Sequence, residues 1–457
     1  MSNTGTKWIL IAGFTAWMFA GLENGLFVLI HRQMMRELLG SETAETVVTQ
    51  WFAWNQAAFM LGAALGGWCF GWLGDRAGRT KALGWSVLCY SLLTLAGWFV
   101  HDAHVMWGLR FLACLGFGGT WPNAVALVAE AYPSASRPFL AGLLGTAANF
   151  GFVLIGFIGF AWPVTDMSWR WTLIVGGVPA ILGAFILWKV PESARWLATC
   201  KLQTLSSSSN GLQPAGPKTV NGTSSPFIEL FSPPLLQRTL LGIALGAVPV
   251  IGTAANANWV VPWTDQVAAR RATESSSEQG NSSSNSSSSS SSSTVKKPKQ
   301  SPKDKAWTMI TRSSGAVVGS LLGGIIASLV GRRLSYFLIS LGTFGISTWL
   351  FTQLSPGDPN FSLFVFLLGF FGVSYFGWLP LFLPELFPTR VRSTGIGIAF
   401  NSGRIAAALV VIFVGIRMSS FEGDYAMIGF WTGLIYVVGM LVIWLAPRHT
   451  QESAPSK

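Results

Sequence analysis

Long apolar stretches alternate with short polar links along almost the whole chain. Most stretches hold about 20 residues with few charged side chains, the length that a helix needs to cross a bilayer. The pattern predicts an all-α polytopic membrane protein. Its twelve transmembrane helices are expected near residues 8–30, 51–72, 82–101, 104–130, 139–162, 170–190, 238–263, 307–330, 334–353, 359–384, 393–416 and 425–446.

Two polar segments interrupt the series of spans. One follows the sixth span, and the other contains a Ser- and Lys-rich tract at 272–305 that is typical of disorder. We expect an N-terminal six-helix bundle at 1–190, a cytoplasmic linker at 191–237, a C-terminal six-helix bundle at 238–450 with a disordered extracytoplasmic loop at 264–306, and a cytoplasmic tail at 451–457.

The composition agrees with a protein covered by lipid. Hydrophobic residues make up 51% of the 457 residues and charged residues only 11%, whereas soluble domains carry about 25% charged residues. Charge this sparse cannot cover a water-facing surface, so the lipid bilayer must cover much of the molecule. The apolar N-terminal run is too long for a signal peptide and holds Glu23, so we expect an uncleaved first helix.

The formal net charge of +11 comes mostly from Lys and Arg in the links between spans. If the N-terminus is inside the cell, the inner short links hold most of these residues, as cytoplasmic loops do. The 264–306 loop is an exception, because it is predicted outside and carries several Lys. We expect a plasma-membrane protein, in the inner membrane of a bacterium, with both termini cytoplasmic and no nucleic-acid partner.

Reactive residues form no catalytic or metal-binding set. The four cysteines lack metal spacing, three of them lie in apolar spans, and the four histidines lie in loops or at span ends. No GxxxxGK[ST] phosphate loop occurs. We therefore expect no enzyme, no metal and no other cofactor.

The link "GWLGDRAGRTK" at 71–81 has a counterpart in the second half of the chain. "GIIASLVGRRL" at 324–334 repeats two of its three glycines and one Arg at the same spacing. Likewise "EAYPSASR" at 130–137 and "ELFPTRVR" at 385–392 share Glu, Pro and Arg. Two matches in the same order predict two six-helix pseudo-repeats.

These features resemble the major facilitator superfamily. The 71–81 link is similar to its motif between spans two and three, "RFLACLGFGG" at 110–119 to its fourth-span Arg motif, and "PESARWL" at 191–197 to the motif after span six. "LPELFPTRVRSTGIGIAFNSGR" at 383–404 resembles the organic-anion and sialate-type metabolite:proton symporters. The resemblance implies alternating access, in which two halves rock about a central site. We expect the transporter to function as a monomer.

The links between spans are expected to form a conformational latch at the cytoplasmic side. Asp75 is placed to meet a helix N-terminus of the opposite half, where the helix dipole favours a carboxylate, and the resemblance implies that Arg79 pairs with Glu130. The second copy has Ser328 where the first has Asp75, so the latch should be lopsided. The expected latch residues are Gly71, Asp75, Arg76, Gly78, Arg79, Glu130, Arg137, Arg332, Glu385 and Arg392.

Two charged residues inside the N-terminal spans are candidates for proton coupling. Glu23 lies roughly 22 Å from the inner end of span one, and Arg110 roughly 9 Å below the outer end of span four. Ionisable groups inside a membrane are costly and usually face a cavity or a partner. The family resemblance implies that the first and fourth helices both line the cavity, so we expect the two side chains to pair, with H+ as the coupling ion. Alternatives are a structural ion pair or a brace within the N-terminal half.

Arg404 is the candidate for binding substrate. It lies roughly 18 Å into span eleven, and no acidic residue lies well inside the C-terminal spans. This pattern favours a substrate carboxylate as its partner, although backbone carbonyls or Glu23 remain possible partners. Further substrate-binding candidates, each with an equally strong structural interpretation, are Asn149, Asn256, Asn258, Trp259, Tyr375 and Trp378.

The sequence thus predicts a proton-coupled symporter of a small organic anion, either a monocarboxylate or a sialate-like acid. "PESARWL" also fits a proton-coupled sugar or polyol transporter. A membrane sensor without turnover and a channel are alternatives from other classes.

Overall fold

A computed structural model of the chain describes residues 3–132, 137–162, 168–209, 225–261, 263–264, 267, 303–416 and 425–447. Within these residues it contains twelve helices long and apolar enough to cross a membrane. The sequence pattern predicted this architecture because each span must satisfy its backbone hydrogen bonds internally.

The first six spans come from the N-terminal half of the chain. They are formed by α1 (Asn3–Leu39), α2 (Glu45–Ala77), α3 (Arg79–Ala96) with η1 (Gly97–Phe99), α4 (Ala103–Ala131), α5 (Arg137–Ala161), and α6 (Trp171–Gly177) with α7 (Pro179–Lys189). Two short helices, α8 (Ala194–Ser209) and α9 (Pro226–Leu230), follow the sixth span.

The last six spans come from the C-terminal half. They are formed by α10 (Leu236–Ala255) with η3 (Ala257–Trp259), α12 (Lys303–Val330), α13 (Arg332–Gln353), α14 (Phe361–Leu386), η4 (Thr389–Val391) with α15 (Arg392–Ile416), and α16 (Tyr425–Gly433) with α17 (Ile435–Val442) and η6 (Ile443–Leu445).

Some helices extend beyond the apolar stretches that predicted them. α1 continues to Leu39 because Ile30, Met34 and Met35 remain buried in the N-terminal half. α12 begins at Lys303, inside the segment expected to be a disordered loop, because helical hydrogen bonding continues about one turn beyond the apolar residues. Residues 268–302, with most of the Ser-rich tract, and the 451–457 tail lie outside the described residues.

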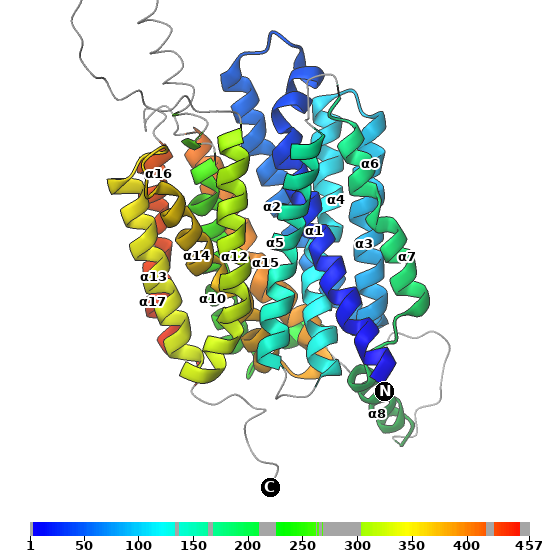
Figure 1. Ribbon diagram of the computed structural model, residues 1–457. Coiled ribbons are helices and arrows are strands. Elements are labelled where there is room, and N and C mark those ends of the chain that lie inside the picture. The colour runs from blue at the N-terminus through cyan, green and yellow to red at the C-terminus, as the bar shows by residue number, and fades with distance from the viewer. Residues whose placement is uncertain are drawn as a thin grey trace, which may run out of the picture.

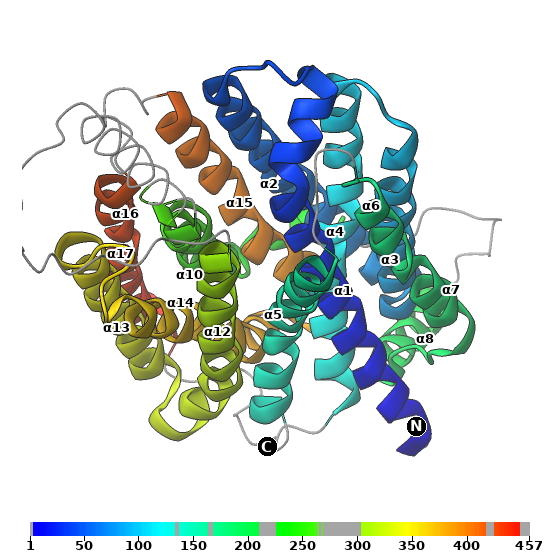
Figure 2. The same ribbon diagram turned by 45° about the horizontal axis from the view of Figure 1, so that its top comes forward.

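The two sets of spans form two bundles that lie side by side (Figures 1 and 2). α2 packs against α15, and α5 packs against α12, so these two pairs make most of the interface between the halves. We call the end of the molecule at which α1 begins the proximal end; α8 lies there too (Figure 1).

Glycines let the halves approach closely near the proximal end. A Cβ atom on Gly71 would lie 2.9 Å from the Ser393 carbonyl oxygen, and one on Gly142 would lie 2.3 Å from the Leu321 carbonyl oxygen. Each of these glycines lies in the proximal part of its helix. The backbones of opposite halves therefore meet here without intervening side chains, and the proximal end is closed in this conformation.

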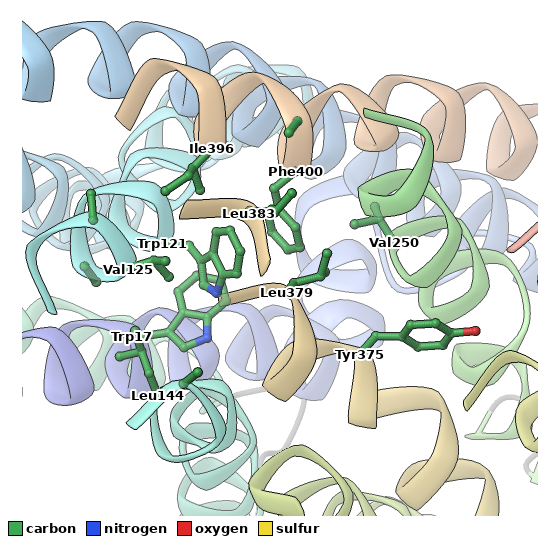
Figure 3. Packing of buried hydrophobic residues seen from close by; sticks show 14 of the residues in the cluster. Trp17, Trp121, Val125, Leu144, Val250, Tyr375, Leu379, Leu383, Ile396 and Phe400 are labelled. Atoms are coloured by element: carbon green, nitrogen blue, oxygen red, sulfur yellow. The ribbon is translucent and has the colours of Figure 1, made fainter. Parts of the chain in front are cut away.

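An aromatic stack joins the halves farther from the proximal end. Trp121 of α4 stacks on Phe400 of α15 with ring centroids 4.1 Å apart. Trp17 of α1 lies beside Trp121, with centroids 6.4 Å apart (Figure 3). These rings belong to one buried cluster that spans both halves. Most of the core that holds the two bundles together is therefore aromatic and aliphatic rather than polar.

The predicted duplication is visible in the backbone. Gly78 separates α2 from α3 with φ +113°, and Gly331 separates α12 from α13 with φ +95°. Both positions need the left-handed region that L side chains rarely adopt. They differ in surroundings, because the Glu192 carboxylate packs against Gly78 and accepts hydrogen bonds from the backbone N–H groups of Arg79 (3.0 Å) and Thr80 (3.2 Å).

This difference predicts unequal effects of alanine at the two glycines. Gly78→Ala and Gly331→Ala each strain the backbone by about 1–3 kcal/mol. Only the Cβ at position 78 also meets Glu192, 2.1 Å from Oε2, whereas position 331 has nothing within 4 Å. We expect Gly78→Ala to lower the thermal unfolding temperature in detergent more than Gly331→Ala does. Equal shifts would contradict the structural role of Glu192.

Candidate functional site

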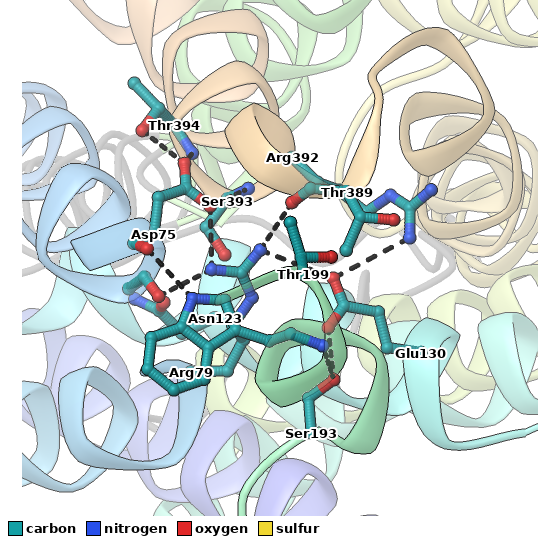
Figure 4. A network of polar contacts seen from close by, with 12 residues as sticks. Asp75, Arg79, Asn123, Glu130, Ser193, Thr199, Thr389, Arg392, Ser393 and Thr394 are labelled. Carbon is teal, nitrogen blue, oxygen red and sulfur yellow. Dashed lines mark hydrogen bonds and ion pairs between the residues drawn. The ribbon is translucent and has the colours of Figure 1, made fainter. Parts of the chain in front are cut away.

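The end of α2 contacts the start of α15 through Asp75. Its Oδ1 accepts a hydrogen bond from the Ser393 N–H (3.2 Å), and its Oδ2 accepts one from the Thr394 N–H (2.8 Å) and another from the Thr394 hydroxyl (Figure 4). Asp75 and its Arg79 partner, 2.8 Å away, are both buried. The carboxylate thus caps a helix N-terminus of the opposite half, the contact that the sequence predicted.

Arg79 connects Asp75 to the rest of the latch. Its Nη1 donates to the Gly74 carbonyl (2.6 Å), while its Nη2 donates to the Thr389 carbonyl in the other half (2.6 Å) and lies 3.4 Å from Glu130. Arg392, also from the other half, lies 3.6 Å from the same Glu130 oxygen. Two acids and two arginines therefore balance one another across the interface (Figure 4).

The second copy of the latch is weaker. Arg332 donates to the Ala327 carbonyl (3.1 Å), as Arg79 does to Gly74, and pairs with Glu385 at 2.9 Å. Ser328, in the place of Asp75, is exposed and donates to the Ile325 carbonyl of its own helix. The latch is therefore lopsided in its contacts, as expected from the lost Asp.

Three other predicted latch residues have different placements. Arg76 is exposed and contacts the Trp72 ring. Gly71 packs against the Ser393 carbonyl. The side chain of Arg137 lies outside the described part of the structure.

The start of the linker adds residues that the sequence had not assigned to the latch. Glu192, described above, is one of them. Ser193 donates a hydrogen bond to Glu130, and the Trp196 indole donates one to the Asp75 backbone carbonyl (2.9 Å). All three lie in "PESARWL". The motif could have indicated that this segment belongs to the latch. Its partners could not be predicted, because they depend on how the start of the linker packs against the ends of the spans.

Glu23 and Arg110 form a buried ion pair inside the N-terminal half. Arg110 Nη1 contacts Glu23 Oε1, which also accepts a hydrogen bond from the Thr94 hydroxyl (3.2 Å). Arg110 Nη2 donates to the Asn24 side chain (3.3 Å). Among the described residues, Glu23 Oε2 is buried without a hydrogen-bond partner. The predicted pairing is present, and the carboxylate retains one oxygen free to accept a proton.

A narrow pocket adjoins Arg110 on the side away from the latch. It is lined by Phe27, Val28, His31, Phe52, Asn55, Gln56 and Arg110. His31 and Asn55 are both buried. The polar side chains here lie toward the distal end of α1 and the start of α2.

Arg404 is buried where α15 faces the N-terminal half, and its surroundings are aromatic. Its guanidinium carbon lies 5.2 Å from the centroids of the Phe59 and Phe117 rings and 5.3 Å from that of Phe400. Its Nε donates to the Asn401 side chain (3.0 Å). Within the described residues, no carboxylate forms an ion pair with Arg404. Aromatic faces stabilise a guanidinium, but they do not neutralise its charge.

Three other substrate-binding candidates have structural partners instead of a free face. The Asn256 amide donates to the Ser347 hydroxyl (2.9 Å) and the Gly429 carbonyl (2.5 Å). The Tyr375 hydroxyl donates to Ser340 (2.8 Å), and the Trp378 indole donates to the Arg332 carbonyl (3.0 Å). All three are fully buried in the C-terminal half. These residues stabilise contacts between helices. Sequence alone could not distinguish this role from substrate binding.

One of the remaining candidates, Asn258, contacts a residue that the sequence analysis missed. Asn258 accepts a hydrogen bond from Arg312 of α12 (3.1 Å), and the Arg312 Nε is buried without a partner among the described residues. Trp259 and Asn149 are half-buried. Arg312 lies inside an apolar span, as Arg404 does, so the same argument from intramembrane charge could have found it.

The chain is similar to known membrane transporters in sequence and in fold. A family described as "Sugar (and other) transporter" matches residues 8–219, and one described as "Major Facilitator Superfamily" matches residues 282–457. A solved structure of the proton:xylose symporter XylE is similar with a TM-score of 0.70 and 16% identity, covering 97% of this chain and 96% of that one. This likeness shows the fold.

Several curated relatives carry the names of organic acids. The chain is 26% identical to the "Probable 4-methylmuconolactone transporter" of Cupriavidus pinatubonensis, over 84% of this chain and 79% of the relative. It is 25% identical to the "Cis,cis-muconate transport protein" of Acinetobacter baylyi, over 79% and 76%. It is 32% identical to the "Gallate transporter" of Pseudomonas putida over 42% and 41%.

The latch geometry predicts the effect of Asp75→Asn. The asparagine loses the ion pair with Arg79 and turns an amide N–H₂ toward backbone donors that need an acceptor. We expect the proximal end to open more often. A cysteine at the buried Leu144, in a background whose native cysteines are replaced by serine, should react several-fold faster with a water-soluble maleimide.

Arg76→Gln is the matched control, because Arg76 belongs to the same link but is exposed. It should leave the labelling rate unchanged. An unchanged rate in Asp75→Asn as well would show that Asp75 does not hold the proximal end closed.

Proposed function

We propose that this chain, which belongs to the major facilitator superfamily, is a proton-coupled symporter of small organic acids. Its twelve spans and its family support a membrane transporter, and we infer that it works by rocking two halves about a central site. The substrate class and the coupling ion are the parts that we infer from the site.

The observation that carries the proposal is the uncompensated charge of Arg404. A guanidinium buried at this depth is costly unless an anion pairs with it, and no described carboxylate does so. A substrate carboxylate can form two parallel hydrogen bonds with the guanidinium fork. The Phe59, Phe117 and Phe400 rings around it present flat apolar surfaces. These surfaces favour planar aromatic or unsaturated acids, in keeping with the names of the relatives.

The Glu23–Arg110 pair supplies a proton site in the other half. When Glu23 is ionised, it neutralises Arg110. Burial favours the neutral carboxyl and the neighbouring cation favours the carboxylate, so a modest change in surroundings shifts the balance. Binding of a proton would release Arg110 from its partner and leave its charge unbalanced.

The closed proximal end assigns this conformation to one step of the cycle. We infer that the proximal end is cytoplasmic, with both termini inside, and that this conformation is therefore closed to the cytoplasm. Substrate and proton would enter from the opposite side, and breaking the Asp75 contacts with Ser393 and Thr394 would open the inner side.

A neutral sugar or polyol is the alternative substrate class. The match to the "Sugar (and other) transporter" family allows it, but a sugar would leave the charge of Arg404 without a partner. A sensor or a channel would also fit the twelve spans. Counterflow into preloaded proteoliposomes separates these alternatives, because neither a sensor nor a channel exchanges substrate.

We predict which compounds the transporter exchanges and how Arg404 contributes to their binding. Benzoate, cis,cis-muconate and gallate should exchange in preloaded proteoliposomes, whereas xylose and sialic acid should not. Arg404→Lys should raise the half-saturating benzoate concentration about 10- to 100-fold, because a point charge replaces a bidentate fork. Exchange of xylose in place of the acids, or an unchanged half-saturation in the variant, would contradict the assignment.

We also predict separate effects of Glu23→Gln on exchange and on accumulation. The variant keeps a hydrogen-bonding side chain but cannot release a proton. It should abolish benzoate accumulation driven by an inward proton gradient while sparing exchange of preloaded benzoate. The ratio of these two rates, measured on the same vesicles, checks the prediction. Retained gradient-driven accumulation would exclude Glu23 as the proton carrier.

A further inference from the structure

One aromatic ring contacts both sites of the proposed mechanism. Phe59 of α2 is buried, and its ring centroid lies 5.4 Å from the guanidinium carbon of Arg110 and 5.2 Å from that of Arg404. Arg110 belongs to the N-terminal half and Arg404 to the C-terminal half. The ring therefore lies at the point where the proton site and the anion site come closest.

The shared ring limits the distance between the two cations. Both guanidinium carbons are within 5.4 Å of one centroid, so their separation cannot exceed the sum of the two distances. Two charges at about 10 Å interact appreciably where water is excluded.

We propose that Phe59 is a positioning residue that couples the protonation of Glu23 to anion binding at Arg404. The inference rests on the proposed function, since it assigns a proton to Glu23 and a carboxylate to Arg404. The ring holds both guanidinium groups at a fixed separation and keeps water from the space between them.

The coupling follows from the charges on the two sides of the ring. With Glu23 ionised, the Glu23–Arg110 pair is close to neutral and Arg404 alone attracts the anion. With Glu23 protonated, the charge of Arg110 is unbalanced, and a carboxylate at Arg404 interacts favourably with both cations. At about 10 Å and an effective dielectric constant of about 20, this interaction corresponds to roughly a tenfold change in affinity. Linkage requires that the bound anion favours protonation of Glu23 by the same factor.

Other titratable groups near Glu23 and the ring are few among the described residues. Tyr90 of α3 and Cys114 of α4 interact with Glu23, and His31 of α1 lines the pocket beside Arg110. Tyr90 and Cys114 are neutral near neutral pH. Histidine is the side chain whose ordinary pKa lies nearest neutral pH, so the test includes a His31 variant.

The neighbouring rings offer matched controls. Phe27 contacts Arg110, with a centroid distance of 3.8 Å, and has no such contact with Arg404. Phe117 contacts Arg404 at 5.2 Å and has no such contact with Arg110. Replacing each of the three phenylalanines by leucine removes an aromatic face of similar size, but only Phe59→Leu removes the shared one.

The experiment measures half-saturation of benzoate exchange in preloaded proteoliposomes, at acidic and at alkaline pH equal on both sides. In the wild type, the acidic value should be roughly tenfold lower than the alkaline value. Glu23→Gln should show the acidic value at both pH values, and His31→Gln should keep the wild-type ratio. Phe59→Leu should reduce the ratio to about threefold or less as water screens the cations, and Phe59→Tyr should restore it.

Phe117→Leu should raise half-saturation by a similar factor at both pH values, and Phe27→Leu should keep the wild-type ratio. A wild-type ratio in a folded, active Phe59→Leu protein would overturn the inference while leaving the proposed function intact. An equal decrease of the alkaline-to-acidic half-saturation ratio in Phe27→Leu and Phe59→Leu would also overturn it. The pH dependence would then require only packing against Arg110, and not a ring shared with Arg404. No benzoate exchange, or a pH-independent wild type, would instead overturn the proposed function.

Discussion

Balancing charge inside hydrocarbon is the constraint on which the rest of this structure depends. A buried ion needs a partner because its hydration is lost. Asp75, Arg79, Glu130 and Arg392 meet this need across the interface between the halves, and Glu23 and Arg110 meet it within one half. Arg404 has no such partner among the described residues, which is why we propose that a substrate anion supplies it.

The two halves share a backbone but differ in charge. Both use a glycine with positive φ between the second and third helices of the repeat, and both anchor an arginine on the carbonyl five residues earlier. Only the N-terminal copy has an aspartate to reach the opposite half. The described spans of the N-terminal half hold ion pairs, whereas Arg312 and Arg404 of the C-terminal half contact neutral amides. This asymmetry is the basis on which we propose proton chemistry in one half and anion binding in the other.

The start of the linker extends the latch beyond the spans. Glu192 caps the start of α3, Ser193 contacts Glu130, and Trp196 contacts the Asp75 carbonyl. A movement of α2 away from α15 must therefore also disturb the linker. The linker thus connects opening of the proximal end to the first helices of the N-terminal half.

The sequence by itself determined the twelve spans and the duplication, and its family resemblance led to the expected pairs Glu23–Arg110 and Arg79–Glu130. These predictions were possible because a helix must be long and apolar to cross hydrocarbon. Charged residues inside such helices are rare, so few pairings between them are possible. Only the tertiary structure decided that Asn256, Tyr375 and Trp378 serve packing, that Glu192 joins the latch, and that Phe59 lies between Arg110 and Arg404. Neutral polar and aromatic residues are tolerated on any face of a membrane-spanning helix. Their contacts therefore depend on how each helix is rotated and packed, which local sequence does not encode.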